Sequence, residues 1–229
     1  MTIIIVAAIG ALIGIFVAGN NSSTSATSKV TDVSLVNSML SGIPQQGTIL
    51  GSSSAPVTMY AYEDLKCPIC QNFNLNVFPT LISKYVKTGQ MKVEYIPQTF
   101  VGQAAAPGDS ARAAKFALAA AEQSKFWNFA ELFYHNQQDE NSTYVTNAFL
   151  TNLGKNVPGL NVNKALSDMN SSQIASSISA ASSQFTQAGF TGTPSFQLSK
   201  NGSTPTALKV STLSVDQFTG PIDQLLAQQ

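Results

Sequence analysis

The two cysteines of the chain constrain its fold more than any other feature, because they stand only three positions apart. Both lie in EDLKCPICQNF, residues 63–73, where Pro68 and Ile69 separate Cys67 from Cys70. Thiols at this spacing can close a small disulfide loop, bind a metal ion or exchange electrons with other thiols. The rest of the sequence discriminates among these three uses.

A purely structural role is the weakest interpretation of the cysteine pair. In the chain-entropy model a disulfide stabilises more when it closes a longer loop, and two intervening residues close almost none. A structural zinc ion needs four ligands, and the only other soft ligand in the chain is His135. His135 ends an amphipathic pattern, FAELFYHNQ, where an exposed or capping imidazole is expected. The pattern therefore favours electron exchange, with no metal site and no cofactor beyond the cysteine pair.

The first nineteen residues predict a targeting or membrane segment. An unbroken apolar run covers residues 3–18, and the first Lys or Arg is Lys29. The run is intermediate between a signal-peptide core of about 7–15 residues and a membrane-spanning helix of about 17–25. Val17-Ala18-Gly19 suits a cleavage site, whereas the missing early basic residues favour an uncleaved anchor. Both alternatives place the rest of the chain outside the cytoplasm, where disulfides persist.

The composition after this segment predicts a linker and one folded domain. The polar stretch NNSSTSATSK is typical of a tether, so we expect a linker over residues 20–47 and a domain over residues 48–229. A hydrophobic content of 44% in 229 residues suits a single core. The 12 basic and 12 acidic residues cancel, and no basic run is present, which argues against a nucleic-acid partner.

The residues on either side of the cysteines predict a strand followed by a helix. VTMYAYEDL is rich in β-branched and aromatic residues, and apolar residues then recur at helical spacing from Ile69 to Tyr85. Cys67 is thereby placed at the N-terminus of the helix. Pro68 suits the first helical position, because the NH group that proline lacks has no helical partner there.

A helix N-terminus makes the two thiols unequal. Its unpaired NH groups and positive dipole end stabilise a thiolate on Cys67. Cys70 lies one turn further along the helix, and we expect it to be less exposed and less easily ionised. The pattern predicts an outer nucleophile, Cys67, and an inner resolving partner, Cys70.

The chain resembles the DsbA-like branch of the thioredoxin superfamily in the order of its motifs. A strand is followed by C-P-x-C, a helix and, much later, the GTPSF motif at residues 192–196. The resemblance covers roughly residues 55–227. It implies an α/β fold, a thioredoxin fold with a helical subdomain inserted at about residues 105–189. It also implies that the Thr193-Pro194 bond is cis, faces the cysteine pair and offers backbone groups to a substrate peptide.

The resemblance further implies thiol-disulfide exchange, with disulfide formation as the expected direction. A reductase or isomerase would use the same residues, and a non-catalytic peptide-binding or chaperone module is a third alternative. The implied partners are cysteine-containing exported proteins, a membrane redox protein of the DsbB or VKOR type that reoxidises the pair, and the membrane itself through residues 3–18. The implied location is extracytoplasmic.

Two positions depart from the family pattern. Many relatives carry a buried acid six positions before the first cysteine, where this chain has Ala61. Glu63 and Asp64 are candidates for its proton-handling role, although each is expected to be a solvated loop charge. Ile69 stands where the best-known oxidase of the family has a histidine. Lys66 is expected to be an exposed charge that stabilises the Cys67 thiolate only slightly. We therefore expect a less acidic first cysteine than in the strongest oxidants.

Overall fold

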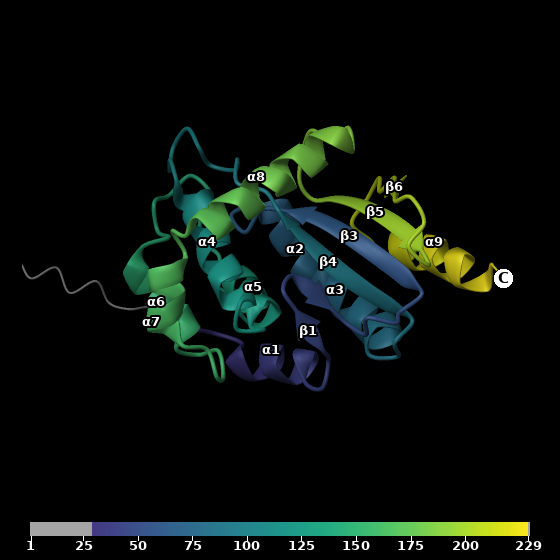
Figure 1. Cartoon of the computed structure of the whole chain (residues 1–229), viewed down its shortest axis with the longest axis horizontal. Coiled ribbons are helices and arrows are strands. Elements are labelled where there is room, and N and C mark those ends of the chain that lie inside the picture. The colour runs from purple at the N-terminus through teal and green to yellow at the C-terminus, as the bar shows by residue number, and fades with distance from the viewer. Residues whose placement is uncertain (1–28, 229) are drawn as a thin grey trace, which may run out of the picture.

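The computed structural model describes residues 29–228 as one sheet with helices packed against it and a helical subdomain at one end (Figure 1). The strands are β1 (Gln45–Gln46), β2 (Ile49–Leu50), β3 (Val57–Glu63), β4 (Met91–Pro97), β5 (Ser195–Lys200) and β6 (Thr206–Leu208). The helices are α1 (Val33–Leu40), α2 (Pro68–Asn76), α3 (Phe78–Leu81), a π-helical turn η1 (Ile82–Val86), α4 (Asp109–Ala121), α5 (Phe126–His135), α6 (Asn147–Gly154), α7 (Val162–Asp168), α8 (Ser172–Gln187) and α9 (Val215–Ala227). None of these helices has the length and apolar character needed to span a membrane; the predicted anchor, residues 3–18, lies outside the described residues.

Strand β3 is central in the sheet, whose order is β1-β2-β4-β3-β5-β6. It runs parallel to β4 and antiparallel to β5. Successive side chains of a strand face opposite sides of the sheet. Accordingly Met59 and Ala61 belong to the main core, whereas Tyr60 and Tyr62 belong to a smaller cluster on the other face. Because β3 leads directly into α2, this strand holds the first cysteine against the core.

The predicted thioredoxin fold with an inserted helical subdomain is confirmed. Helices α4–α8 lie between β4 and β5 in the chain. Figure 1 shows α4–α7 gathered at one end of the sheet, while α8 runs from this group along the sheet and contacts β4. Together these helices run from Asp109 to Gln187, within the predicted 105–189. Helix α5 is at the centre of this group, since it packs against α1, α2, α4 and α6.

Part of the predicted linker is folded. Helix α1 buries Val36 and Leu40 in the main core, and β1 pairs with β2. The amide of Gln45 donates to the side-chain oxygen of Asn128 on α5 at 2.8 Å. The prediction of a linker over residues 20–47 is therefore wrong from Val33 onward, because a two-turn helix with only two core residues barely changes the local composition.

We expect a chain that starts at residue 48 to be less stable than one that starts at residue 29. The shorter chain loses Val36 and Leu40, and full burial of an apolar side chain contributes about 1.5–3 kcal/mol. The expected loss is at least about 3 kcal/mol. Urea unfolding followed by the fluorescence of the single tryptophan, Trp127, measures it. Equal midpoints for the two truncated chains would contradict the role of α1.

Candidate active site

The turn between β3 and α2 places Cys67 at the N-cap of α2, as the sequence predicts. Pro68 is the first helical residue, and the backbone of Cys67 is extended with φ −75° and ψ 120°. The Cys67 sulfur accepts the backbone NH of Cys70 at 3.4 Å, and the Cys67 carbonyl accepts the NH of Gln71 at 3.0 Å. Both cysteines are free thiols in the structure. The orphan NH groups of the helix are thus directed at the Cys67 sulfur.

The Thr193-Pro194 peptide lies against the same sulfur. This bond is cis, as predicted, and the Cys67 thiol donates to the Thr193 carbonyl oxygen at 3.4 Å. Two segments 126 residues apart therefore meet at one sulfur atom. Thr193 and Pro194 are themselves half-buried, so part of this strand start is open to solvent.

The environment of the two thiols separates their pKa values. A hydrogen bond from the Cys70 thiol, with further hydrogen bonds from Thr193 and from the backbone NH groups of Cys70 and Ile69, outweighs burial and lowers the pKa of Cys67 to about 6. Burial raises the pKa of Cys70 well above that of an ordinary thiol. Cys67 is less exposed to solvent than predicted, because only 4% of its surface is accessible. Cys70 is fully buried.

Alkylation of the reduced protein should report this asymmetry. We expect iodoacetamide to modify Cys67 with a midpoint near pH 6 and to leave Cys70 unmodified, because the thiolate is the reactive form. Cys70→Ala should raise the midpoint, since it removes the largest stabilising hydrogen bond, whereas Cys70→Ser keeps a donor and should raise it less. Mass spectrometry of peptides quenched across a pH series measures both. A Cys67 midpoint above pH 8 would contradict the geometry.

Glu63 is fully buried beneath the cysteine pair, which corrects the prediction of a solvated loop charge. Its Oε2 atom accepts a hydrogen bond from the side-chain amide of Asn74 at 2.5 Å and from the hydroxyl of Tyr134 at 3.1 Å. Burial raises the pKa of Glu63 to about 8, although these two hydrogen bonds oppose the shift. The charge of Glu63 also raises the pKa of Cys70, so the two groups are electrostatic neighbours. Glu63 lies two positions after Ala61, on the same face of β3.

Asp64 is likewise buried and not solvated. Its carboxylate accepts the hydroxyl of Ser110 at 2.7 Å and the backbone NH groups of Phe100 and Val101 at 3.0 and 2.9 Å. Burial raises the pKa of this carboxyl group, and the Ser110 hydrogen bond opposes the rise. Asp64 therefore joins the end of β3 to the loop after β4 and to the start of α4.

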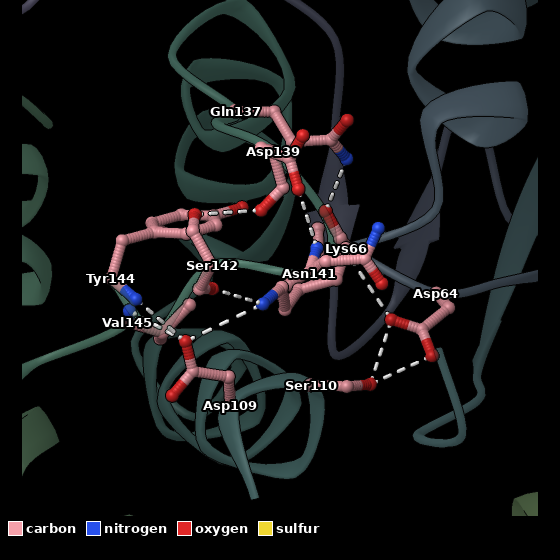
Figure 2. A network of polar contacts seen from close by, with 11 residues as sticks. Asp64, Lys66, Asp109, Ser110, Gln137, Asp139, Asn141, Ser142, Tyr144 and Val145 are labelled. Atoms are coloured by element: carbon pink, nitrogen blue, oxygen red, sulfur yellow. Dashed lines mark hydrogen bonds and ion pairs between the residues drawn. The ribbon is translucent and has the colours of Figure 1, made fainter. Parts of the chain in front are cut away.

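Lys66 is fully buried, whereas the sequence predicts an exposed charge. Figure 2 shows its ammonium group held between Asp109 and the loop that follows α5: it lies 3.5 Å from the Asp109 carboxylate and donates to the Ser142 carbonyl at 2.8 Å. The ring of Tyr144 lies 4.8 Å from the same nitrogen. The Lys66 charge is thus satisfied by the helical subdomain, which fixes the residue immediately before Cys67.

The surface next to the thiols is apolar in part. Ile69 is 54% exposed and Pro68 is exposed, while Phe100, on the loop held by Asp64, is 43% exposed. The ring of Phe100 packs at a tilt against that of Phe185 on α8, with the ring centroids 5.7 Å apart. The sequence analysis missed Phe100, since only the fold brings its loop beside the residues that precede Cys67.

The thioredoxin family model matches residues 44–209 of the chain, which is more than half of its length. The chain belongs to the thioredoxin family. Among its relatives in this family, the Bacillus anthracis "Probable disulfide bond formation protein D" is 28% identical over 170 residues, 74% of this chain and 76% of that protein. The Bacillus subtilis "Disulfide bond formation protein D" is 29% identical over 127 residues, 52% of this chain and 53% of that protein.

Solved structures show which thioredoxin-family fold this is. The crystal structure of oxidised BdbD from Bacillus subtilis superposes with a TM-score of 0.68 at 22% identity, covering 81% of this chain and 98% of that chain. The crystal structure of Chlamydia trachomatis DsbA gives 0.64 at 19% identity, covering 78% and 90%. With the named relatives, this makes the chain a DsbA-like thiol-disulfide oxidoreductase of the thioredoxin family.

Proposed function

We propose that the protein forms disulfide bonds in cysteine-containing exported proteins by exchange with a Cys67–Cys70 disulfide. The observation that carries the proposal is the position of the Cys67 sulfur, which meets both the N-terminus of α2 and the Thr193 carbonyl. An extended substrate can pair with backbone groups beside Thr193 while its cysteine reaches Cys67. The cysteine pair is itself the redox group, and no further cofactor is required.

The exchange proceeds in two displacements. A substrate thiolate attacks the Cys67 sulfur, a substrate–Cys67 bond forms, and the Cys67–Cys70 bond breaks with Cys70 leaving as a thiolate. A second substrate thiolate then attacks the substrate sulfur of this mixed disulfide and releases Cys67 as a thiolate. The substrate loses two electrons and the cysteine pair gains them. Glu63, whose pKa is raised to about 8, holds a proton at neutral pH that Cys70 can accept.

The acidity of Cys67 favours oxidation of substrates, but moderately. With a pKa of about 6, the thiolate outnumbers the thiol about tenfold at pH 7, which stabilises the reduced pair by about 1.4 kcal/mol, or about 30 mV. The span from thioredoxin at about −270 mV to DsbA at about −120 mV corresponds to roughly 7 kcal/mol. We therefore expect a reduction potential above that of thioredoxin and below that of DsbA.

The direction and the location of the reaction complete the proposal. Disulfide formation is supported by the Bacillus relatives, which are named as a probable disulfide bond formation protein D and a disulfide bond formation protein D. The apolar run at residues 3–18 supports attachment to the outer face of a membrane. A membrane protein of the DsbB or VKOR type would then reoxidise the pair, since each turnover leaves it reduced.

The reduction potential of the full chain, carried in detergent micelles, tests the proposed direction. We expect equilibration with glutathione buffers to give a value between about −270 and −120 mV. The oxidised protein should also convert a reduced, unfolded two-cysteine protein to its disulfide form stoichiometrically. A potential below that of thioredoxin, or faster reshuffling of a scrambled substrate than oxidation of a reduced one, would instead make it a reductase or isomerase.

A further inference from the structure

A polar cleft in the helical subdomain has no part in the exchange reaction. It lies between α4, α6 and α7 and has a volume of about 370 Å³, within the range of small-ligand sites, about 300–1,000 Å³. Its polar lining is Arg112 and Lys115 of α4, Asn147 of α6 and Asn170, which follows α7. None of these side chains hydrogen-bonds to the Cys67 sulfur, so the cleft is separate from the redox site.

The cleft carries two positive charges without a negative partner. Arg112 and Lys115 are three positions apart on α4, which places them on one face of the helix, where like charges repel. Neither belongs to an ion pair formed within residues 29–228, and the lining of the cleft in this range includes no Asp or Glu. Asp109 and Asp168, on the flanking helices, are each paired with a lysine outside the cleft. An anion between the two cations relieves their repulsion.

Arg112 is the single arginine of the chain, against eleven lysines. One of its terminal nitrogens donates to the side-chain oxygen of Asn147 at 3.5 Å, which places the guanidinium group at the α6 side of the cleft. Its other nitrogens make no hydrogen bond to a described residue. A guanidinium group presents a planar fork of NH donors that matches two oxygens of a phosphate or carboxylate, which an ammonium group does not. The one arginine is therefore where such a fork lines a cleft.

We propose that this cleft binds a phosphate group, whose charge is neutralised by the arginine and the lysine of α4. A phosphate offers three or more acceptor oxygens, and the two cations and the two asparagine amides of the lining supply the donors. The rest of the lining is apolar, chiefly Leu166 and Met169, and suits the carbon atoms of a phosphate ester. The inference goes beyond the proposed function and does not depend on it.

The position of the cleft brings it near one source of phosphate groups, the headgroups of a membrane. Lys29, the first described residue, lies beside Asn156, just after α6, because both line one surface pocket. The folded part of the chain thus begins at the subdomain that holds the cleft, and Figure 1 shows α6 and α7 at the end of the molecule opposite α9. Ten residues separate Lys29 from the apolar run at residues 3–18, and ten residues reach at most about 36 Å. An anchored run keeps this subdomain within that distance of the lipid surface.

Nitrogen-15 NMR of the full chain in neutral maltoside micelles tests the site, because a single arginine gives a single side-chain Nε–H signal. We expect this signal to move saturably when inorganic phosphate is added at constant ionic strength, and to stay in place with chloride. Lys115→Gln should weaken phosphate binding about three- to tenfold, the effect of one charge contact in a partly open cleft. Arg112→Lys, followed by phosphorus-31 NMR of the phosphate, should weaken it to a similar extent, since lysine keeps the charge and loses the fork.

A matched control separates a built site from a diffuse positive surface. Lys155→Gln removes an exposed charge of the same subdomain outside the cleft lining and should leave the phosphate affinity unchanged. The rate of Cys67 alkylation should be the same in all three variants, which shows that the fold is intact. Equal weakening by Lys155→Gln and Lys115→Gln, a response that stays linear in phosphate, or acetate binding as tight as phosphate binding overturns the proposal.

Two phosphate probes identify the source of the ligand. Inorganic phosphate is compared with glycerophosphoglycerol, the soluble headgroup of phosphatidylglycerol, in the same micelles. Tighter binding of the headgroup, which we expect from the apolar part of the lining, assigns the cleft to the lipid surface, and tighter binding of inorganic phosphate assigns it to free phosphate. Binding of neither probe overturns the proposal. A protein that binds phosphate but oxidises no substrate would support the cleft while removing the proposed function.

Discussion

A Cys70→Ser variant is expected to accumulate mixed disulfides with exported proteins, whereas a Cys67→Ser variant is expected to accumulate none. Cys67 carries the stabilised thiolate beside Thr193, so it is the sulfur that a substrate meets. Cys70 is fully buried one turn along α2, and its reaction is with Cys67. Without Cys70, a captured substrate loses its intramolecular route of release.

The expected effect is large because the lost step is intramolecular. Well-oriented groups in one molecule react with effective concentrations far above those of free thiols, so the lifetime of the adduct should lengthen by at least about 100-fold. Non-reducing electrophoresis and mass spectrometry of the adducts measure this. Since the chain has only these two cysteines, each adduct reports on a single sulfur. Adducts that form on Cys67→Ser and not on Cys70→Ser would reverse the two assigned roles.

Replacing Lys66 by Met is expected to destabilise the reduced protein by about 3 kcal/mol, because it leaves the buried Asp109 carboxylate without its cation. Asp109 keeps the backbone NH groups of Tyr144 and Val145 at 2.8 and 3.0 Å, which places the effect at the lower end of the usual 3–5 kcal/mol. Urea unfolding followed by Trp127 fluorescence measures the free energy of unfolding.

A matched control is the surface pair between Lys84 and Asp223, whose side chains are 47% and 53% exposed. Lys84→Met should destabilise the protein far less than Lys66→Met, because solvent screens an exposed pair. The double variant Lys66→Met/Asp109→Leu should recover part of the loss, since it removes both buried charges together. Equal effects of Lys66→Met and Lys84→Met would show that the Lys66 contacts contribute nothing beyond a surface pair.

The sequence by itself determined the local architecture of the site. The strand, the C-P-x-C turn and the helix follow from short-range patterns, because β-branched runs, helical spacing and a proline at the first helical position act within one element. The same patterns place Cys67 at the N-cap of α2 and identify the helical segments of the insertion. The cis bond before Pro194 followed from the resemblance of GTPSF to a family motif.

Only the tertiary structure decided which polar side chains are buried. Glu63, Asp64 and Lys66 belong to a charged stretch that predicts a solvated loop, yet residues 100–101, 109–110 and 142–144 fold over Asp64 and Lys66 and supply their partners. Glu131 is on a helix whose apolar stripe predicts one exposed face, but α5 is enclosed by four other helices. Burial is a property of what packs against a residue, and most of those partners come from positions far away in the chain, up to 76 residues distant.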